Sequence, residues 1–129
     1  MPLVKVYLKN REDIDKHGIA NSLRNIMQKI LHVPVQDGPV TFLEIDASSW
    51  FMPEGWEEEF VFVEVLMFPG RKKETKEKLI TEFANALSHS LNISKDSVIT
   101  TLHEPSLDNW GIRGGKQASS TGISFNLEV

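Results

Sequence analysis

The segment VFVEVLMFPGRKKETKEK (residues 61–78) decides the fold, because it joins a strand pattern directly to a helix pattern. Residues 61–68 are mostly apolar and predict a strand, and Pro69-Gly70 is a turn signal. Beyond the turn, apolar residues recur three and four positions apart, which predicts an amphipathic helix with the stripe Leu79, Ile80, Phe83, Leu87 and Leu91. A further strand is predicted at residues 98–102, so this half of the chain forms a β-α-β unit.

The first half of the chain has the same order of elements. Residues 3–8 predict a strand, and a helix follows with the apolar stripe Ile14, Ile19, Leu23, Ile26, Met27, Ile30 and Leu31. Val33-Pro34 ends that helix, because proline disfavours helical geometry in the preceding residue, and residues 40–45 predict the next strand. Identical residues also recur 60 positions apart, notably Arg11 with Arg71 and Trp50 with Trp110. The sequence therefore predicts a duplication.

These patterns predict one domain of the α/β (α+β) class. We expect repeat one at about residues 2–51, an acidic linker at 52–59 and repeat two at about 60–115. Tandem β-α-β repeats give a four-stranded sheet with two helices on one face. Apolar residues alternate with polar ones over residues 123–129, which predicts a short closing strand at the C-terminus. The apolar sheet face that two helices leave uncovered predicts association with other copies.

Composition restricts the class of function. The chain has 129 residues, 40% of them hydrophobic, with a formal net charge of −4, which argues against nucleic acid or a membrane as the main partner. It has no cysteine and no signal-peptide pattern, so we expect a cytoplasmic protein. Nucleotide-binding and zinc motifs are missing, and the four histidines lack metal-ligand spacing. The sequence thus predicts no cofactor and no metal.

Pro2 has a chemistry that no other residue of the chain offers. If Met1 is removed, Pro2 becomes a secondary amine at the chain end, and an ordinary α-amino group has a pKa of about 7.7–8.0. An apolar pocket with a nearby cation lowers such a pKa, so the amine would be neutral and able to act as a general base. If Met1 is retained, the same nitrogen is an amide without a basic lone pair. The alternative is that proline follows Met1 by chance.

Three stretches together resemble a known family. Met1-Pro-Leu-Val-Lys-Val, Gly70-Arg71 and Asn109-Trp-Gly-Ile-Arg-Gly-Gly115 look like the tautomerase superfamily, and above all like its fused two-repeat members. Their relatives include 4-oxalocrotonate tautomerase, malonate semialdehyde decarboxylase and cis-3-chloroacrylic acid dehalogenase. The resemblance covers nearly the whole chain. It implies an enzyme without a cofactor and a homotrimer of two-repeat chains with pockets near subunit boundaries.

The resemblance also implies roles for individual residues. Pro2 takes the place of the family's catalytic amino-terminal proline, and Arg71 that of an arginine that binds a substrate carboxylate. A planar guanidinium suits this role because it donates two parallel hydrogen bonds; the alternative for Arg71 is a solvated charge at the helix start. Trp110 matches an aromatic residue of the pocket wall, with ordinary packing near a turn as the alternative.

Asp37 matches a water-activating aspartate of the decarboxylase branch, although Gln36-Asp37-Gly38-Pro39 is also an ordinary turn sequence. The chain departs from the family in two places. That branch has two arginines close together at the start of the second helix, whereas this chain offers only Arg71, and Ile99 stands where the single-repeat tautomerase has another arginine. The glycines at 111, 114 and 115 suit an anion-binding nest or, as the resemblance implies, a hairpin at a subunit interface.

Three functions remain open from the sequence. The leading one is a cofactor-independent tautomerase or isomerase of a small 2-oxo acid, with Pro2 and Arg71 catalytic and with Asp37 and Trp110 contacting the substrate. The second is a hydratase or decarboxylase of a small 3-oxo or unsaturated acid. The third is an oligomeric binding module without catalysis. A small carboxylate-bearing substrate is the partner expected for the first two.

Overall fold

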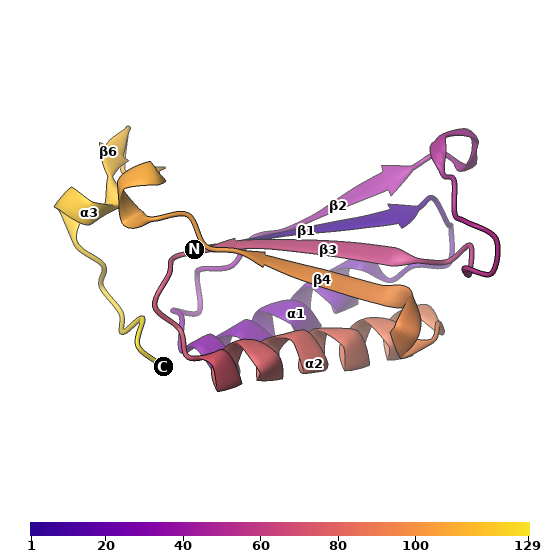
Figure 1. Ribbon diagram of the computed structural model, residues 1–129, viewed down its shortest axis with the longest axis horizontal. Coiled ribbons are helices and arrows are strands. Elements are labelled where there is room, and N and C mark those ends of the chain that lie inside the picture. The colour runs from indigo at the N-terminus through magenta and orange to yellow at the C-terminus, as the bar shows by residue number, and fades with distance from the viewer.

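The computed structural model describes residues 1–129 and confirms the predicted fold class. Two long helices cover one face of a four-stranded sheet (Figure 1). The elements follow in the order β1 (Pro2–Lys9), α1 (Lys16–Leu31), β2 (Val40–Ile45), β3 (Val61–Met67), α2 (Lys73–Leu91), β4 (Val98–His103), β5 (Gly111–Ile112), β6 (Lys116–Gln117) and α3 (Ala118–Thr121). No helix is both long enough and apolar enough to cross a membrane.

The sheet has the order β2-β1-β3-β4. β1 pairs in parallel with β2, and β3 pairs in parallel with β4, as expected for two β-α-β units. The two units meet through an antiparallel pairing of β1 with β3, in which Pro2 lies opposite Met67 and Leu8 opposite Val61. This pairing brings the start of the chain beside the end of β3, from which the chain continues toward Arg71.

Local chemistry accounts for the start of α1 and for the ends of both long helices. α1 has Asp15 as its N-cap, whose carboxylate accepts a hydrogen bond from the Gly18 backbone N–H at 3.0 Å. It ends at His32 in the left-handed conformation, just before Val33-Pro34. α2 ends in the same way at Asn92, a residue type that tolerates this conformation.

The core lies between the helices and the sheet. It contains 16 buried hydrophobic residues, drawn from alternate positions of β1 and β3, from one stripe of each long helix and from Val33. Val4, Val6 and Leu8 of β1 are buried, while the residues between them face the other side of the sheet. Because each buried aliphatic side chain stabilises the fold by about 1.5–3 kcal/mol, this layer holds the two repeats together.

The other face of the sheet is uncovered in the single chain. It is less apolar than predicted, because Lys5, Tyr7, Glu64 and His103 stand among its hydrophobic residues. A hydrogen bond to Glu64 raises the pKa of Tyr7, and His103 Nε2 lies 3.5 Å from the Glu64 carboxylate. Glu64 thus interacts with polar side chains of both neighbouring strands.

The C-terminal region differs from the prediction in where its strands lie. The expected strand at residues 123–129 is not formed, and the short strands of this region are β5 and β6, joined by a turn at residues 113–115. The tail still alternates between half-buried and exposed residues, but it runs past the end of the sheet (Figure 1). Alternation of apolar and polar residues indicates that one side of a segment is buried. It does not show that another strand lies beside the segment and pairs with it. One backbone bond, from Lys72 N–H to the Val129 carbonyl, fixes its end.

Candidate active site

The fold brings all four predicted site residues to one end of the sheet. Pro2 begins β1, and Arg71 follows β3 by four residues. Asp37 precedes β2, which starts beside Val4 of β1. Trp110 follows β4, which runs parallel to β3. Neighbouring strands in this topology therefore collect side chains that are far apart in sequence.

The chain start is held in the sheet rather than left free. Pro2 is buried and is paired with Met67, a position at the strand start where proline's missing N–H costs least. The amino group of Met1 lies 3.5 Å from Asp37 Oδ2. The nitrogen of Pro2 is one residue further along the chain, so removal of Met1 would expose its amine close to this carboxylate.

Asp37 is placed by the turn that precedes β2. Its backbone N–H donates to the Pro34 carbonyl at 3.0 Å, and the Pro39 carbonyl accepts from Val4 N–H at 3.0 Å. The turn interpretation of this sequence is thus correct in structural terms. It does not exclude a chemical role, because the Asp37 side chain is about one-third exposed and faces the chain start.

Arg71 is 5% exposed and lacks partners for most of its donors. Nη1 donates to the Phe68 carbonyl at 2.9 Å, whereas Nε and Nη2 are buried without a hydrogen-bond partner. The guanidinium carbon lies 5.8 Å from the centre of the Phe125 ring. Burial lowers the pKa of Arg71, and the nearby Glu104 carboxylate only partly opposes this effect. A buried cation with free donors is an environment that an anion would stabilise.

Trp110 lies behind the pocket rather than in its wall. It is 8% exposed, and its indole N–H donates to the Pro105 carbonyl at 3.1 Å. Its ring meets that of Phe68 edge-on with centroids 4.9 Å apart. Trp110 therefore fixes Phe68, which does line the pocket.

A pocket of about 250 Å³ opens between these elements. Its wall includes Met1, Asp37, Phe68 and Phe125. Arg71 does not line it, because the ring of Phe125 lies against the guanidinium. Sequence reasoning missed Phe68 and Phe125 as pocket residues. The alternation that places Phe125 on a buried side was the available signal, but it pointed to a strand.

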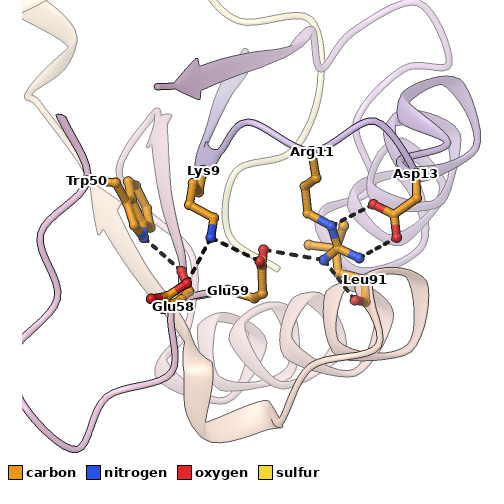
Figure 2. Close-up of polar contacts among 7 residues, drawn as sticks. All are labelled: Lys9, Arg11, Asp13, Trp50, Glu58, Glu59 and Leu91. Atoms are coloured by element: carbon orange, nitrogen blue, oxygen red, sulfur yellow. Dashed lines mark hydrogen bonds and ion pairs between the residues drawn. The ribbon is translucent and has the colours of Figure 1, made fainter. Parts of the chain in front are cut away.

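Arg11, the counterpart of Arg71 in the first repeat, lies at the opposite end of the sheet, and its donors have partners (Figure 2). Arg11 donates to both carboxylate oxygens of Asp13 at 2.9 Å, and its Nη1 donates to the Leu91 carbonyl at 3.0 Å. The Glu59 carboxylate lies 3.8 Å away. The bonds from Arg11 lower the pKa of Asp13. Of the two duplicated arginines, Arg71 alone has buried donors left for a ligand.

Comparison with known proteins identifies the family. The family model described as tautomerase enzyme matches residues 37–113, which is more than half of the chain. The chain belongs to the tautomerase enzyme family. The match covers Asp37, Arg71 and Trp110 and ends within the turn between β5 and β6.

Solved structures share the fold of this tautomerase-family chain along nearly all of its length. A protein inactivated by 2-oxo-3-pentynoate matches with a TM-score of 0.86 and 16% identity over 94% of this chain and 99% of its own. A symmetric trimer of wild-type fused 4-OT matches with a TM-score of 0.82 and 22% identity over 94% and 99%. Malonate semialdehyde decarboxylase, described with decarboxylase and hydratase activities, matches with a TM-score of 0.75 and 24% identity over 92% and 96%.

Proposed function

We propose that this protein is a cofactor-independent tautomerase that interconverts the keto and enol forms of a small 2-oxo acid. The observation that carries the proposal is Arg71, a buried guanidinium with two unpartnered nitrogens at the end of the sheet where the chain begins. A solved relative inactivated by 2-oxo-3-pentynoate, itself a small 2-oxo acid, supports this substrate class.

Pro2 is the base in this proposal. Pro2 is buried and its neighbour Met1 packs against the apolar cluster that contains Phe68. Burial favours the neutral form of the secondary amine that removal of Met1 would create. The neutral amine removes the enol proton and returns it to carbon as general acid. Malonate semialdehyde decarboxylase has been studied with its first residue, a proline, changed to alanine.

Arg71 holds the substrate carboxylate and stabilises negative charge on the developing enolate. Its unpartnered Nε and Nη2 are adjacent donors of the guanidinium fork, which is the geometry that a carboxylate accepts. Because the Phe125 ring lies over the guanidinium, a carboxylate that binds at this position has to displace that ring. The chain works as a homotrimer, as fused 4-OT relatives do.

Two measurements test this function. Intact mass spectrometry of protein from its native host should show loss of Met1, because a retained methionine leaves Pro2 without a basic amine. The Pro2→Ala variant keeps a terminal amine but makes it primary, so kcat/KM with phenylenolpyruvate or 2-hydroxymuconate should fall by at least about 100-fold. Full activity of Pro2→Ala, or an active protein that retains Met1, would refute the proposal.

A hydratase or decarboxylase acting on a small 3-oxo or unsaturated acid is the second candidate, and the position of Asp37 favours it. This carboxylate lies 3.5 Å from the amino group of Met1, so removal of Met1 leaves it facing the space next to Pro2, where it would orient a water molecule. Asp37→Asn separates the two functions. It should abolish hydration of 3-haloacrylic or alkynoic acids, while kcat/KM for ketonisation of phenylenolpyruvate stays within about three-fold of the wild-type value. Equal loss of both reactions would argue against a water-activating role for Asp37.

A further inference from the structure

The last seven residues of the chain, 123–129, form a tail that lies across the end of the sheet. The tail runs from α3 back to the start of α2 (Figure 1), and Phe125 and the two residues before it line the pocket. The bond from Lys72 N–H to the Val129 carbonyl is the one backbone hydrogen bond between the tail and the rest of the chain. Half-buried apolar side chains at alternate positions supply its other contacts.

Phe125 is the tail residue that covers Arg71. Its ring centre lies 5.8 Å from the guanidinium carbon, and the same ring stacks with that of Phe68 at a centroid distance of 6.4 Å. Nε and Nη2 of Arg71, the two donors that a carboxylate needs, are buried in this arrangement, and the pocket does not reach them. The tail is therefore in a closed position, in which these donors are shut off from solvent.

Gly122 gives the tail a hinge. Its φ of +77° is one that residues with a side chain rarely adopt, and no atom lies within 4 Å of the place where a Cβ would be. Before this glycine, α3 is held firmly, because Ala118 is fully buried and its N–H donates to the Trp110 carbonyl at 2.9 Å. Rotation about the Gly122 backbone therefore moves the tail without disturbing α3.

Opening of the tail is favoured by how little holds it closed. Ordering a segment of seven residues loses conformational entropy, and only one backbone bond and the half-buried side chains of alternate residues offset that loss. Segments with so few buried contacts open far more readily than a core. A carboxylate at Arg71 stabilises the open state further, because two buried donors then acquire partners.

We propose that residues 123–129 are a lid over Arg71, hinged at Gly122, and that the substrate carboxylate displaces the Phe125 ring when the lid opens. This inference rests on the proposed role of Arg71 as the carboxylate-binding residue and adds a conformational step to it. In the free protein the ring occupies the position over the guanidinium, and in the complex the carboxylate takes that position. A restraint on the tail therefore impairs binding before it impairs chemistry.

A disulfide between the tail and the residue before Arg71 tests the lid. A Cβ built on Gly70 lies 3.3 Å from the Cβ of Leu127, close to the separation of roughly 3.5–4.5 Å found in disulfides. The chain has no cysteine of its own, so Gly70→Cys together with Leu127→Cys allows only this bond within a chain. The oxidised form holds the tail closed. The reduced form has the same substitutions and the same strain at position 70, which makes it the matched control.

The first measurement is the rate at which phenylglyoxal modifies Arg71 without substrate, followed by peptide mass mapping. Oxidation should slow this reaction by at least about 10-fold, because the reagent reaches the guanidinium only when the lid opens. Arg11 lies at the other end of the sheet and should react equally in both forms. Phe125→Ala should speed modification of Arg71 by at least about three-fold, whereas Phe51→Ala, which removes an exposed ring elsewhere, should not.

The second measurement is kcat/KM with phenylenolpyruvate, which should fall by at least about 10-fold on oxidation and return on reduction. Equal modification of Arg71 in the oxidised and reduced forms would overturn the lid, as would an unchanged rate in Phe125→Ala, which decides the matter if the disulfide does not form. Full activity of the oxidised form would also overturn the lid and leave the tautomerase function standing. Protection of Arg71 in a protein that converts no enol would support the lid while the tautomerase function fails.

Discussion

Replacing Arg71 with methionine should make the protein more stable while it loses activity. The Arg71 guanidinium is almost fully buried with Nε and Nη2 unpartnered. Each orphaned donor group costs about 1–3 kcal/mol of folding free energy. Methionine has a similar length, no donors and no charge, so Arg71→Met removes these costs without opening a large cavity.

Arg71→Met also removes two favourable interactions, which offset part of this gain. The Phe68 carbonyl is left without its donor at 2.9 Å, which costs about 1–3 kcal/mol. The interaction of the guanidinium with the Phe125 ring contributes about 0.5–2 kcal/mol. Central values leave a net stabilisation of about 1 kcal/mol, which corresponds to a rise in Tm of about 4 °C for a chain of this length.

Urea and thermal unfolding at one fixed protein concentration measure the change in the free energy of unfolding. The kcat/KM of the same variant with 2-hydroxymuconate is measured in parallel. Burial lowers the pKa of Arg71, so the protonated side chain opposes folding at every pH below that pKa. Arginine stays protonated in proteins, so the gain should be the same at pH 6 and pH 9. A variant less stable than the wild-type protein would show that the buried donors have partners and would refute the reasoning. Undiminished activity would refute the role of Arg71 in substrate binding.

Three further predictions test the fold. Arg11→Ala should cost about 1–2 kcal/mol in urea unfolding, because it removes the bonds to Asp13 and to a helix end, and the difference from wild type should shrink as the pH falls through the lowered pKa of Asp13. Gly70→Ala should cost about 1–3 kcal/mol, since φ is +124° and an added Cβ would lie 3.3 Å from the tail; Gly55→Ala, with φ +90° and no neighbour within 4 Å, should cost less. Phe83→Ala should cost about 3–5 kcal/mol because the side chain is fully buried, and a loss below 1 kcal/mol would contradict that packing.

The sequence predicts the elements of this fold well, because each has a local cause. Apolar periods of two and of three to four residues mark the strands and helices, and Val33-Pro34 marks the end of α1. The antiparallel join of β1 to β3 has no such local cause. This pairing depends on how the two β-α-β units pack against each other, and their order in the sequence is compatible with more than one way of pairing their strands.

The polar candidate residues could be chosen from the sequence, whereas the residues of the pocket wall could not. Pro2 stands out by residue type, the family resemblance selects Arg71 and Asp37, and strand order brings all three to one end of the sheet. The place of Phe125 depends on the path of the tail past the end of the sheet. Periodicity separates a buried face from an exposed one, but it does not identify a half-exposed face that borders a cavity.

Both ends of the chain lie at the same end of the sheet (Figure 1). Met1 touches Asp37, and the Val129 carbonyl is bonded to Lys72 next to Arg71. An affinity tag on either terminus would therefore emerge beside the pocket, and a tag ahead of Met1 would also keep Pro2 as an amide. The loop of residues 52–59 lies at the opposite end, where Gly55 has open space around it. A purification handle inserted there would leave the chain start free for processing and the pocket open to ligands.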